Sequence, residues 1–222
     1  MGYRTVADIF SQISGTYDFF LKVATAGRIH SWQRELVSLM NPGGNWLDVG
    51  TGTGEVLLKL GENYEGLRVG VDPSLEMLRI ADQKCGSCFF VQGIGEALPF
   101  RNGSFSNVSL SLVFRHLEDK MAFLSEANRL LAENGRLGLI DIGRFRGTFL
   151  LLLLMKTLLR PLGVLLFGRD RWSFFIHSVE ESYSIEEIEN MLRLRGFRIQ
   201  EVRKRFLGVV YIVVAVRTAS GT

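Results

Sequence analysis

Glycines at alternate positions follow a short apolar segment that contains one carboxylate, and these residue types suit the binding of a small ligand. The segment reads WLDVGTGTG over residues 46–54. Glycine lets the backbone adopt positive φ and approach a ligand without a Cβ in the way. The helix predicted to follow Gly54 would offer unpaired N–H groups at its start. We therefore predict a binding site at the end of a buried strand; the simpler alternative is a tight structural loop.

The acids Asp48 and Asp72 indicate which ligand this turn would bind. The pattern D-x-G-x-G-x-G lacks the G-x-G-x-x-G spacing of dinucleotide sites and the lysine of a phosphate-binding P-loop. Asp48 would repel a pyrophosphate but could hold a cationic amino group, as at the methionine end of S-adenosyl-L-methionine. Asp72 ends the next apolar segment, where βαβ nucleotide sites place the acceptor for ribose hydroxyls. We predict that Asp48, Gly50, Gly52 and Asp72 bind S-adenosyl-L-methionine rather than NAD.

Strand and helix patterns alternate through the first two thirds of the chain. After helices over residues 6–20 and 28–40, strands are predicted over residues 46–49, 67–71, 88–92, 107–112 and 136–142. Helices are predicted between them, over residues 54–60, 74–81 and 118–131. Strands that alternate with helices favour a parallel sheet with right-handed crossovers.

The C-terminal part completes the predicted sheet in a different way. Ser184 and Glu187 have the spacing of a capping box, and Gly196 would end the helix that they start. Strands over residues 197–205 and 209–217 form a predicted hairpin, so one of them enters the sheet antiparallel. The predicted fold class is α/β: a Rossmann-like, seven-stranded, mostly parallel sheet with one antiparallel strand and helices on both faces.

Length and composition set the expected domain organisation. The 222 residues, 47% of them hydrophobic, suffice for one substantial core. We predict a single domain over residues 1–222, with an N-terminal helical cap at 1–43 and an apolar lid insert at 144–180. The net charge of +3 comes from dispersed basic residues, so no nucleic-acid partner is predicted, and a homodimer is left open. No apolar secretory segment opens the chain, so a cytoplasmic location is expected.

Cys85 and Cys88 form a single C-x-x-C motif. Without a second cysteine pair or a nearby histidine the motif cannot complete a zinc site within one chain, so no metal is predicted. The simplest interpretation is two free thiols in a loop between a helix and a strand. A redox pair and a metal shared between two chains are the alternatives.

A leucine-rich run over residues 148–167 has the hydropathy of a membrane segment without its continuity. Lys156 and Arg160 interrupt the run and Pro161 breaks it, so no stretch reaches the roughly 18 apolar residues that a span needs. Together with flanking arginines, the run predicts an interfacial or lid helix that covers a hydrophobic substrate and contacts anionic lipid at the membrane surface. The alternative is a buried helix packed on the sheet.

Several segments outside the glycine turn resemble one group of enzymes. The sequence is similar to the class I S-adenosylmethionine methyltransferases, and more narrowly to the ubiquinone/menaquinone biosynthesis C-methyltransferase family. The resemblance runs along nearly the whole chain. The segments that carry it are VADIF at 6–10 with Tyr17-Asp18, Gly27 and Trp32; Gln92 with EALPF at 96–100; SLVFRH at 111–116 with Asp119-Lys120; and WSFF at 172–175 with Ser178-Val179.

This resemblance implies roles for particular residues. The positions that would contact S-adenosyl-L-methionine, which becomes S-adenosyl-L-homocysteine, are Thr53, Asp72, Ile94, Gly95 and Ser111. Members of the family carry Asp or Asn where this chain has Ile94, and isoleucine cannot hydrogen-bond the adenine amino group. The loss of such a bond would cost about 1.5–3 kcal/mol. The site would then bind its cofactor less tightly.

The resemblance also implies that Arg115 faces the reacting ring of the substrate. A quinol ring carbon becomes nucleophilic once an ortho hydroxyl loses its proton. Arg115 is always charged, so it would hold the phenolate or orient a water that accepts the proton. His116, which ordinarily titrates near neutrality, is the better candidate for general base. The alternatives are a surface ion pair for Arg115 and a loop position outside the pocket for His116.

The resulting hypothesis is an S-adenosylmethionine-dependent methyltransferase that C-methylates a prenylated, demethylmenaquinol-like quinol in quinone biosynthesis. Its expected partners are this hydrophobic substrate and, peripherally, a membrane surface. Two alternatives stay open: methylation of another lipid or small hydroxyaromatic acceptor, and a methyltransferase-like binding or regulatory protein with weakened cofactor affinity.

Overall fold

A computed structural model describes residues 22, 25, 27–41 and 43–218. The helix predicted over residues 6–20 and most of the predicted cap at 1–43 lie outside these residues.

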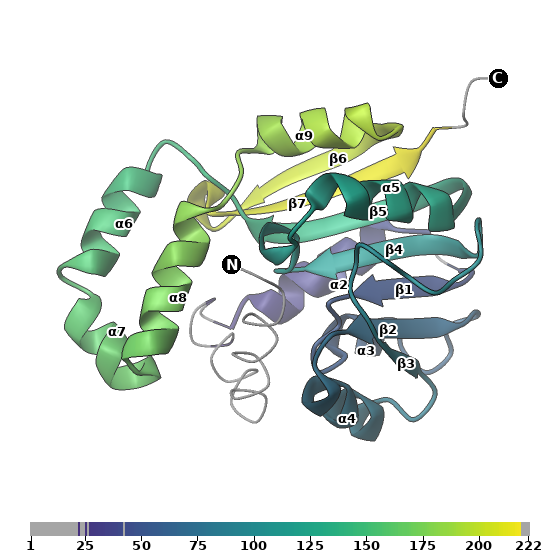
Figure 1. Ribbon diagram of the computed structural model, residues 1–222, viewed down its shortest axis with the longest axis horizontal. Coiled ribbons are helices and arrows are strands. Elements are labelled where there is room, and N and C mark those ends of the chain that lie inside the picture. Colours follow the sequence, from purple (N-terminus) through teal and green to yellow (C-terminus); the bar gives the residue numbers. More distant parts are fainter. Residues whose placement is uncertain (1–21, 23–24, 26, 42, 219–222) are drawn as a thin grey trace.

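A sheet of seven strands organises the described chain (Figure 1). In chain order the strands are β1 (Trp46–Val49), β2 (Arg68–Asp72), β3 (Phe89–Gln92), β4 (Phe105–Ser111), β5 (Leu131–Ile142), β6 (Phe197–Arg205) and β7 (Val210–Arg217). Their order across the sheet is β3-β2-β1-β4-β5-β7-β6, and β7 runs antiparallel to both of its neighbours. The prediction of a mostly parallel sheet with one antiparallel strand is confirmed.

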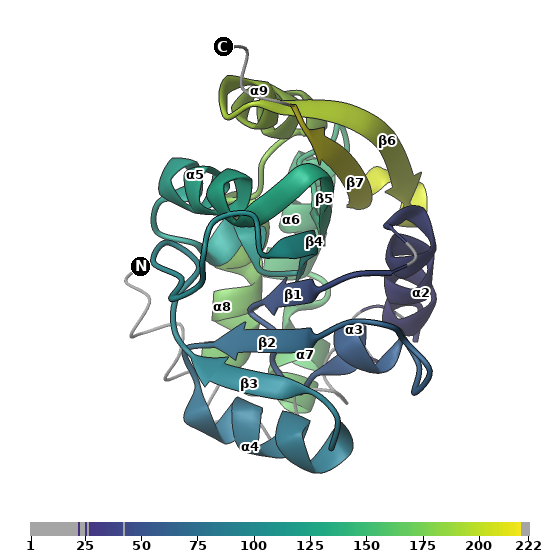
Figure 2. The same ribbon diagram turned by 90° about the vertical axis from the view of Figure 1, so that its right-hand side faces the viewer.

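Helices cover both faces of the sheet (Figure 2). They are α2 (Ile29–Leu39), α3 (Glu55–Leu58), α4 (Leu75–Lys84), α5 (Lys120–Leu130) and α9 (Ile185–Leu194), with short 3-10 helices η1 (Phe114–His116) and η2 (Phe206–Gly208). On one face α5 and α9 bury Phe123, Leu124, Ile188 and Leu192 against the strands. On the other face α2 buries Trp32 and Leu36.

Local sequence signals account for most element boundaries. The capping box of α9 is present, since Glu187 N–H donates to Ser184 Oγ at 3.2 Å and Ser184 N–H donates to Glu187 Oε2 at 2.7 Å. The predicted hairpin forms as β6, η2 and β7. β5 starts five residues before the predicted strand at 136–142, because Leu131 already pairs with Phe105 ahead of the turn at Asn134-Gly135.

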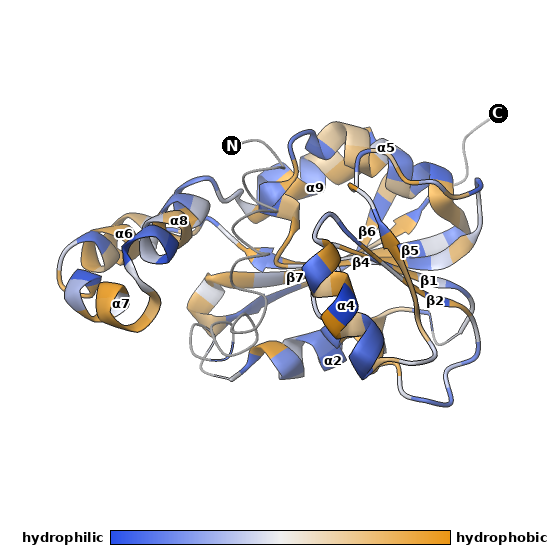
Figure 3. Cartoon of the chain, turned by 60° about the horizontal axis from the view of Figure 1, so that its bottom comes forward, coloured by the Kyte–Doolittle hydropathy of each residue, from blue (hydrophilic) through white to orange (hydrophobic). Residues whose placement is uncertain are grey.

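The predicted lid insert consists of three helices rather than one: α6 (Thr148–Lys156), α7 (Arg160–Phe167) and α8 (Arg169–Glu180). They extend away from the sheet (Figures 1 and 3). They pack on one another around Trp172, which is stacked on Phe167 and donates from Nε1 to the Met155 carbonyl at 3.3 Å. The alternative of a buried helix packed on the sheet is therefore wrong.

The helices of the insert were also compared with the requirements for a transmembrane helix. In the described part of the chain, no helix by itself has the length and hydropathy to cross a bilayer. α6 and α7 meet the criteria only as a pair, and the pair is bent by 70° at its break.

Cys85 and Cys88 lie between α4 and β3 and are joined by a disulfide. This corrects the interpretation of two free thiols. The motif brings its cysteines close enough to pair because only two residues separate them.

Candidate functional site

The glycine turn after β1 has the conformation that its sequence predicts. Gly50, Gly52 and Gly54 have φ values of +66°, +52° and +81°. A Cβ at Gly50 would lie 2.5 Å from Val113 Cγ2, so this position also requires glycine for space. Gly50 and Thr51 donate their N–H groups to the Val71 carbonyl, at 2.8 and 3.0 Å. The turn is therefore fixed to the end of β2.

Asp48 lies beneath this turn as a buried carboxylate. Ser109 Oγ donates to Asp48 Oδ1 at 2.6 Å, and Trp46 Nε1 donates to Ser109 Oγ at 2.8 Å. Burial raises the pKa of Asp48 to about 7, against the lowering effect of the hydrogen bond from Ser109. A buried acid with such a pKa gains most from a ligand that brings a positive charge.

Asp72 connects the end of β2 to the glycine turn. Gly52 N–H donates to Asp72 Oδ2 and Ser74 N–H donates to Asp72 Oδ1, both at 2.9 Å. Burial raises the pKa of Asp72 to about 6, although both backbone hydrogen bonds favour the charged form. The two predicted acids thus lie on either side of the same turn.

A small cavity, here called the turn cavity, brings together five of the predicted cofactor residues: Asp48, Gly50, Gly52, Thr53 and Ser111. Its wall also contains Gln33 of α2, a residue that no sequence motif indicated. Gln33 is buried and donates from Nε2 to Ser111 Oγ at 3.3 Å, while its buried Oε1 has no hydrogen-bond partner among the described residues. A buried acceptor beside a raised-pKa carboxylate fits an ammonium-bearing ligand.

Ile94 and Gly95 lie outside the turn cavity, in the loop after β3. Ile94 forms an isolated bridge with Ala97, whose N–H donates to the Ile94 carbonyl at 3.3 Å. Gly95 is buried, and a Cβ there would approach Phe123, Leu117 and Val49 at 3.1–3.2 Å. The predicted cofactor contacts of these two residues stay predictions.

Arg115 is held by a buried carboxylate on the neighbouring strand. Its backbone N–H donates to Asp141 Oδ2 at 3.0 Å, and its Nη1 forms an ion pair with Asp141 Oδ1. Nη1 also donates to the Leu112 carbonyl at 3.0 Å, whereas the buried Nε makes no hydrogen bond to the described residues. The alternative of a surface ion pair is therefore wrong.

The environment of His116 gives it a lower pKa than its residue type suggests. Its half-buried ring is stacked on Phe174 of α8, with centroids 5.3 Å apart and planes 13° apart. Removal from water, with the charges of Arg115 and Lys120, lowers the pKa of His116 well below 6.5. The expectation of titration near neutrality is therefore corrected: the imidazole is neutral at pH 7, an acceptor but a weak base.

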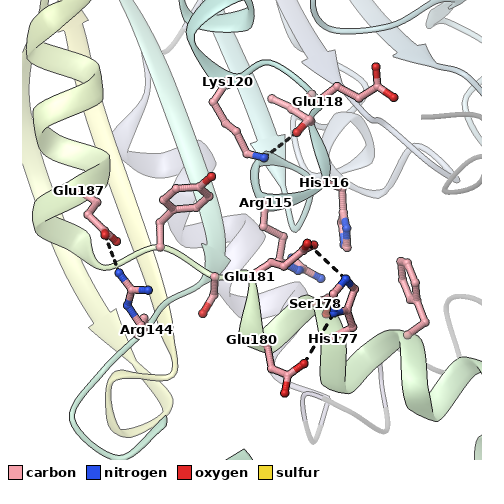
Figure 4. Close-up of a pocket in the computed structure, with 14 residues that line it drawn as sticks. Arg115, His116, Glu118, Lys120, Arg144, His177, Ser178, Glu180, Glu181 and Glu187 are labelled. Atoms are coloured by element: carbon pink, nitrogen blue, oxygen red, sulfur yellow. Dashed lines mark hydrogen bonds and ion pairs between the residues drawn. The ribbon is translucent and has the colours of Figure 1, made fainter. Parts of the chain in front are cut away.

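Arg115 and His116 line a second cavity of about 510 Å³, here called the arginine cavity (Figure 4). Its other walls come from α8 and from the segment before α9, and they include Phe174, His177 and Tyr183. Ion pairs occupy its rim, with Arg144 and Glu187 2.5 Å apart and His177 Nε2 and Glu181 Oε1 3.2 Å apart. No cluster of three or more potential metal ligands occurs in the described ranges.

A single segment, residues 111–115, contributes side chains to both cavities. Ser111 ends β4 on the turn cavity, and Arg115 lies in η1 on the arginine cavity. Between them Leu112 has a φ of +63° and donates its N–H to the Ile140 carbonyl at 2.7 Å. Positive φ is uncommon for a residue with a side chain and is found often at functional sites. The linings of the two cavities thus meet at residues 111–115.

Comparisons with known proteins agree on one family. A model of the ubiE/COQ5 methyltransferase family matches residues 1–217. A demethylmenaquinone methyltransferase of Chlamydia pneumoniae is 29% identical over 92% of both chains. A ubiquinone/menaquinone biosynthesis C-methyltransferase UbiE of Geotalea uraniireducens is 30% identical over 87% of this chain and 88% of that protein.

Solved structures show the same fold at lower identity. An S-adenosylmethionine-dependent methyltransferase of Thermotoga maritima has a TM-score of 0.67 at 20% identity, covering 95% of this chain and 99% of that chain. The [4+2]-cyclase SpnF also has a TM-score of 0.67, at 14% identity, over 86% of this chain and 81% of its own. Because a cyclase shares the fold, the fold alone does not define the reaction.

Proposed function

The chain belongs to the ubiE/COQ5 methyltransferase family and is an S-adenosylmethionine-dependent methyltransferase, and we propose that its acceptor is a ring carbon of a prenylated, demethylmenaquinol-like quinol. The observation that carries this proposal is the arginine cavity, where a buried cation and an aromatic wall lie across residues 111–115 from the turn cavity. The printed names of the relatives support the same class of acceptor.

The residues of the turn cavity fit the methionine end of the cofactor. Bound there, S-adenosyl-L-methionine supplies an electrophilic methyl group. Asp48 would hold the cationic amino group, and the buried Oε1 of Gln33 would accept one of its hydrogens. Gly50 and Gly52 would allow close approach of the ligand to the backbone. Asp72, at the end of β2, would accept the ribose hydroxyls, with Ile94 and Gly95 toward the adenine.

The arginine cavity suits the head group of a quinol. Its volume of about 510 Å³ falls in the ordinary range of ligand pockets, roughly 300–1,000 Å³. Phe174 and Tyr183 offer aromatic surface to a ring. Arg115 offers a fixed positive charge and an Nε donor that makes no hydrogen bond to the described residues. A cation placed where a phenolate forms favours loss of the hydroxyl proton.

Arg115 and His116 would have different roles in activating the ring. Arg115 would stabilise the phenolate, which makes the ortho carbon nucleophilic. The neutral His116, or a water that it orients, would accept the hydroxyl proton. As the new carbon–carbon bond forms, the sulfur–methyl bond breaks. The methylated ring carbon then loses its hydrogen as a proton and restores the aromatic ring.

Methylation of a quinol panel tests the acceptor. Purified protein, S-adenosyl-L-methionine and reduced demethylmenaquinones are incubated, and products are identified by mass spectrometry as quinols with one added CH₂. We expect methylation of prenylated demethylmenaquinol and none of its oxidised quinone, because the quinone lacks the hydroxyl proton. Methylation only of small hydroxyaromatics or of other lipids would replace the proposed acceptor.

Quinones extracted from a strain that lacks the gene give a second test. We expect the unmethylated quinone to accumulate and the methylated quinone to return when the gene is restored. An unchanged quinone pool would overturn the proposed acceptor.

A further inference from the structure

The helices α6 and α7 and the turn between them carry the densest group of exposed apolar side chains in the described chain, here called the leucine surface. In Figure 3 much of this pair has the colour of apolar residues. Phe149 and Leu165 are the most exposed, at 80% and 81%. Its nine members are Phe149, Leu150, Leu153, Leu154, Leu158, Leu159, Leu162, Leu165 and Leu166. The other six exposed large apolar residues are scattered from Leu67 to Leu207. A contiguous apolar surface of this kind marks an interaction site.

The folding of the insert does not explain the leucine surface. The inner side of the pair is already occupied, because Met155 and Gly163 pack against Trp172 of α8. A Cβ at Gly163 would lie 2.3 Å from the Trp172 ring, so this contact is close. The leucines point away from the packed interior of the insert, and their exposure needs another explanation.

The charge of the insert indicates which kind of partner could bind the leucine surface. The insert, residues 144–180, contains six Arg and Lys residues and two acids, Asp170 and Glu180, which gives a net charge of +4. Because the whole chain has a net charge of +3, the remainder is net acidic. Arg144 and Lys156 pair with Glu187 and Glu180. The other four, which form no ion pair with the described acids, are Arg146, Arg160, Arg169 and Arg171.

We propose that the α6–α7 pair is a membrane-docking element that lies in the interface of an anionic lipid bilayer. The leucines would enter the boundary between head groups and acyl chains, and the arginines would bind lipid phosphates. The 70° bend between two helices of nine and eight residues suits a shallow position, because a span needs a continuous helix of about 20 residues.

A second copy of the chain is a poorer occupant of the same surface. A two-fold dimer through the leucine surface would bring two inserts of net charge +4 against each other. Like charges brought together across an interface disfavour association. An anionic lipid bilayer offers acyl chains to the leucines and negatively charged phosphates to the arginines.

Docking through this pair would bring the arginine cavity near the lipid. α8 packs against α6 and α7 and also contributes Phe174 and His177 to the cavity wall (Figure 4). This proposal goes beyond the proposed function and does not depend on it, since lipid binding is measured without methyl transfer.

Vesicle co-sedimentation tests the proposal. The protein is mixed with vesicles of phosphatidylcholine alone or of phosphatidylcholine and phosphatidylglycerol in equal parts, and bound and free fractions are measured. We expect binding to the anionic vesicles and weaker binding at high salt, because surface charge attraction is screened. The double variant Phe149→Glu/Leu165→Glu should bind at least about tenfold more weakly, because both leaflet-facing side chains become charged.

Matched controls keep the result specific. Leu194→Glu introduces the same charge at an apolar side chain of α9 that is 73% exposed, and its binding should equal that of the unchanged protein. Arg160→Gln should weaken binding about fivefold, the effect of one basic residue near an anionic surface. Circular dichroism should show the same fold for all four proteins.

Three vesicle results would overturn the proposal. The unchanged protein binds neither kind of vesicle, the double variant binds as tightly as the unchanged protein, or Leu194→Glu loses as much binding as the double variant. A dimer in gel filtration that the double variant abolishes would assign the leucine surface to a second copy. Vesicle binding without quinol methylation would overturn the acceptor assignment and leave the docking element intact.

Discussion

Asp141 holds Arg115 through both its main chain and its side chain. One carboxylate oxygen accepts the Arg115 N–H at 3.0 Å and the other pairs with the guanidinium, while the Asp141 side chain is fully buried. The position of Arg115 is therefore fixed by β5 as well as by η1. Asp141 is in this sense a positioning residue for the arginine that faces the cavity.

Asp141→Asn should lower both stability and turnover. Asparagine retains the shape but not the charge, and a buried cation that loses its partner typically costs about 3–5 kcal/mol. We expect this loss in urea unfolding, and a lower kcat with an unchanged Kd for S-adenosyl-L-methionine. Glu126→Gln is the control, since its pair with Arg129 is partly exposed and worth no more than about 1 kcal/mol. Equal losses in both variants would contradict the buried role of Asp141.

The raised pKa of Asp48 predicts how the ligand-free protein responds to pH. In the folded protein this carboxyl holds its proton up to about pH 7, whereas its ordinary pKa is 3.8. The folded state therefore binds more protons than the unfolded state between about pH 4 and 7. The free energy of unfolding should fall as pH rises through this window. Asp48→Asn should remove the upper part of this fall, between about pH 6 and 7, in urea titrations, because asparagine does not titrate and Asp72, with a pKa of about 6, contributes below that range.

The same ionisation predicts the pH dependence of cofactor binding. A cationic amino group favours the charged form of Asp48, and the ribose hydroxyls favour the charged form of Asp72, whose pKa is about 6. Calorimetry should show about tenfold tighter binding of S-adenosyl-L-methionine at pH 7 than at pH 5.5, because the charged fraction of Asp48 rises over this range while the amino group of the ligand stays protonated. Binding that is independent of pH, or a pH dependence that is as large in Asp48→Asn as in the unchanged protein, would place the amino group elsewhere.

Gln33→Leu should weaken cofactor binding with little change in fold. Leucine fills a similar volume but removes both the hydrogen bond to Ser111 and the buried Oε1. A lost hydrogen bond to a charged group is worth about 1.5–3 kcal/mol, which corresponds to a Kd for S-adenosyl-L-methionine at least about tenfold higher by calorimetry. Gln83→Leu, on the exposed side of α4, serves as the control and should bind normally. An unchanged Kd in Gln33→Leu would exclude this role.

Ile94→Asp should have the opposite effect. If the loop after β3 lies beside the adenine, a carboxylate there restores an acceptor for its amino group. The Kd for S-adenosyl-L-methionine should fall at least about tenfold, the equivalent of 1.5–3 kcal/mol. The affinity for adenosine, which lacks the methionine part, should rise by the same factor as the affinity for the whole cofactor, because the new hydrogen bond is to the adenine. If the affinity for neither ligand rises, Ile94 does not lie beside the adenine.

The sequence predicted the features that depend on neighbouring residues. The glycine turn, both acids at strand ends and the Ser184–Glu187 capping box are set by local spacing, and the structure has them where they were expected. Gln33 was overlooked because a glutamine on an amphipathic helix does not reveal which strand end it faces. Its partner Ser111 is 78 residues away.

Features built from distant segments could not be read from local patterns. The Arg115–Asp141 pair needs the register of β4 on β5, which places η1 beside the end of β5. The pKa of His116 follows from burial under Phe174, 58 residues further along the chain and beyond the bend of the insert. A residue's ionisation is a property of its surroundings, so the histidine alone suggested the wrong value.

The place of β7 between β5 and β6 has a consequence for synthesis of the protein. Residues 136–142 of β5 pair with residues 210–216, so one edge of β5 has no strand partner until that segment has left the ribosome. An open strand edge is prone to pair with other chains. The strand that carries Asp141 is therefore made well before it gains a partner on this edge, and a nascent chain stalled before residue 210 would hold Arg115 on an unfinished sheet.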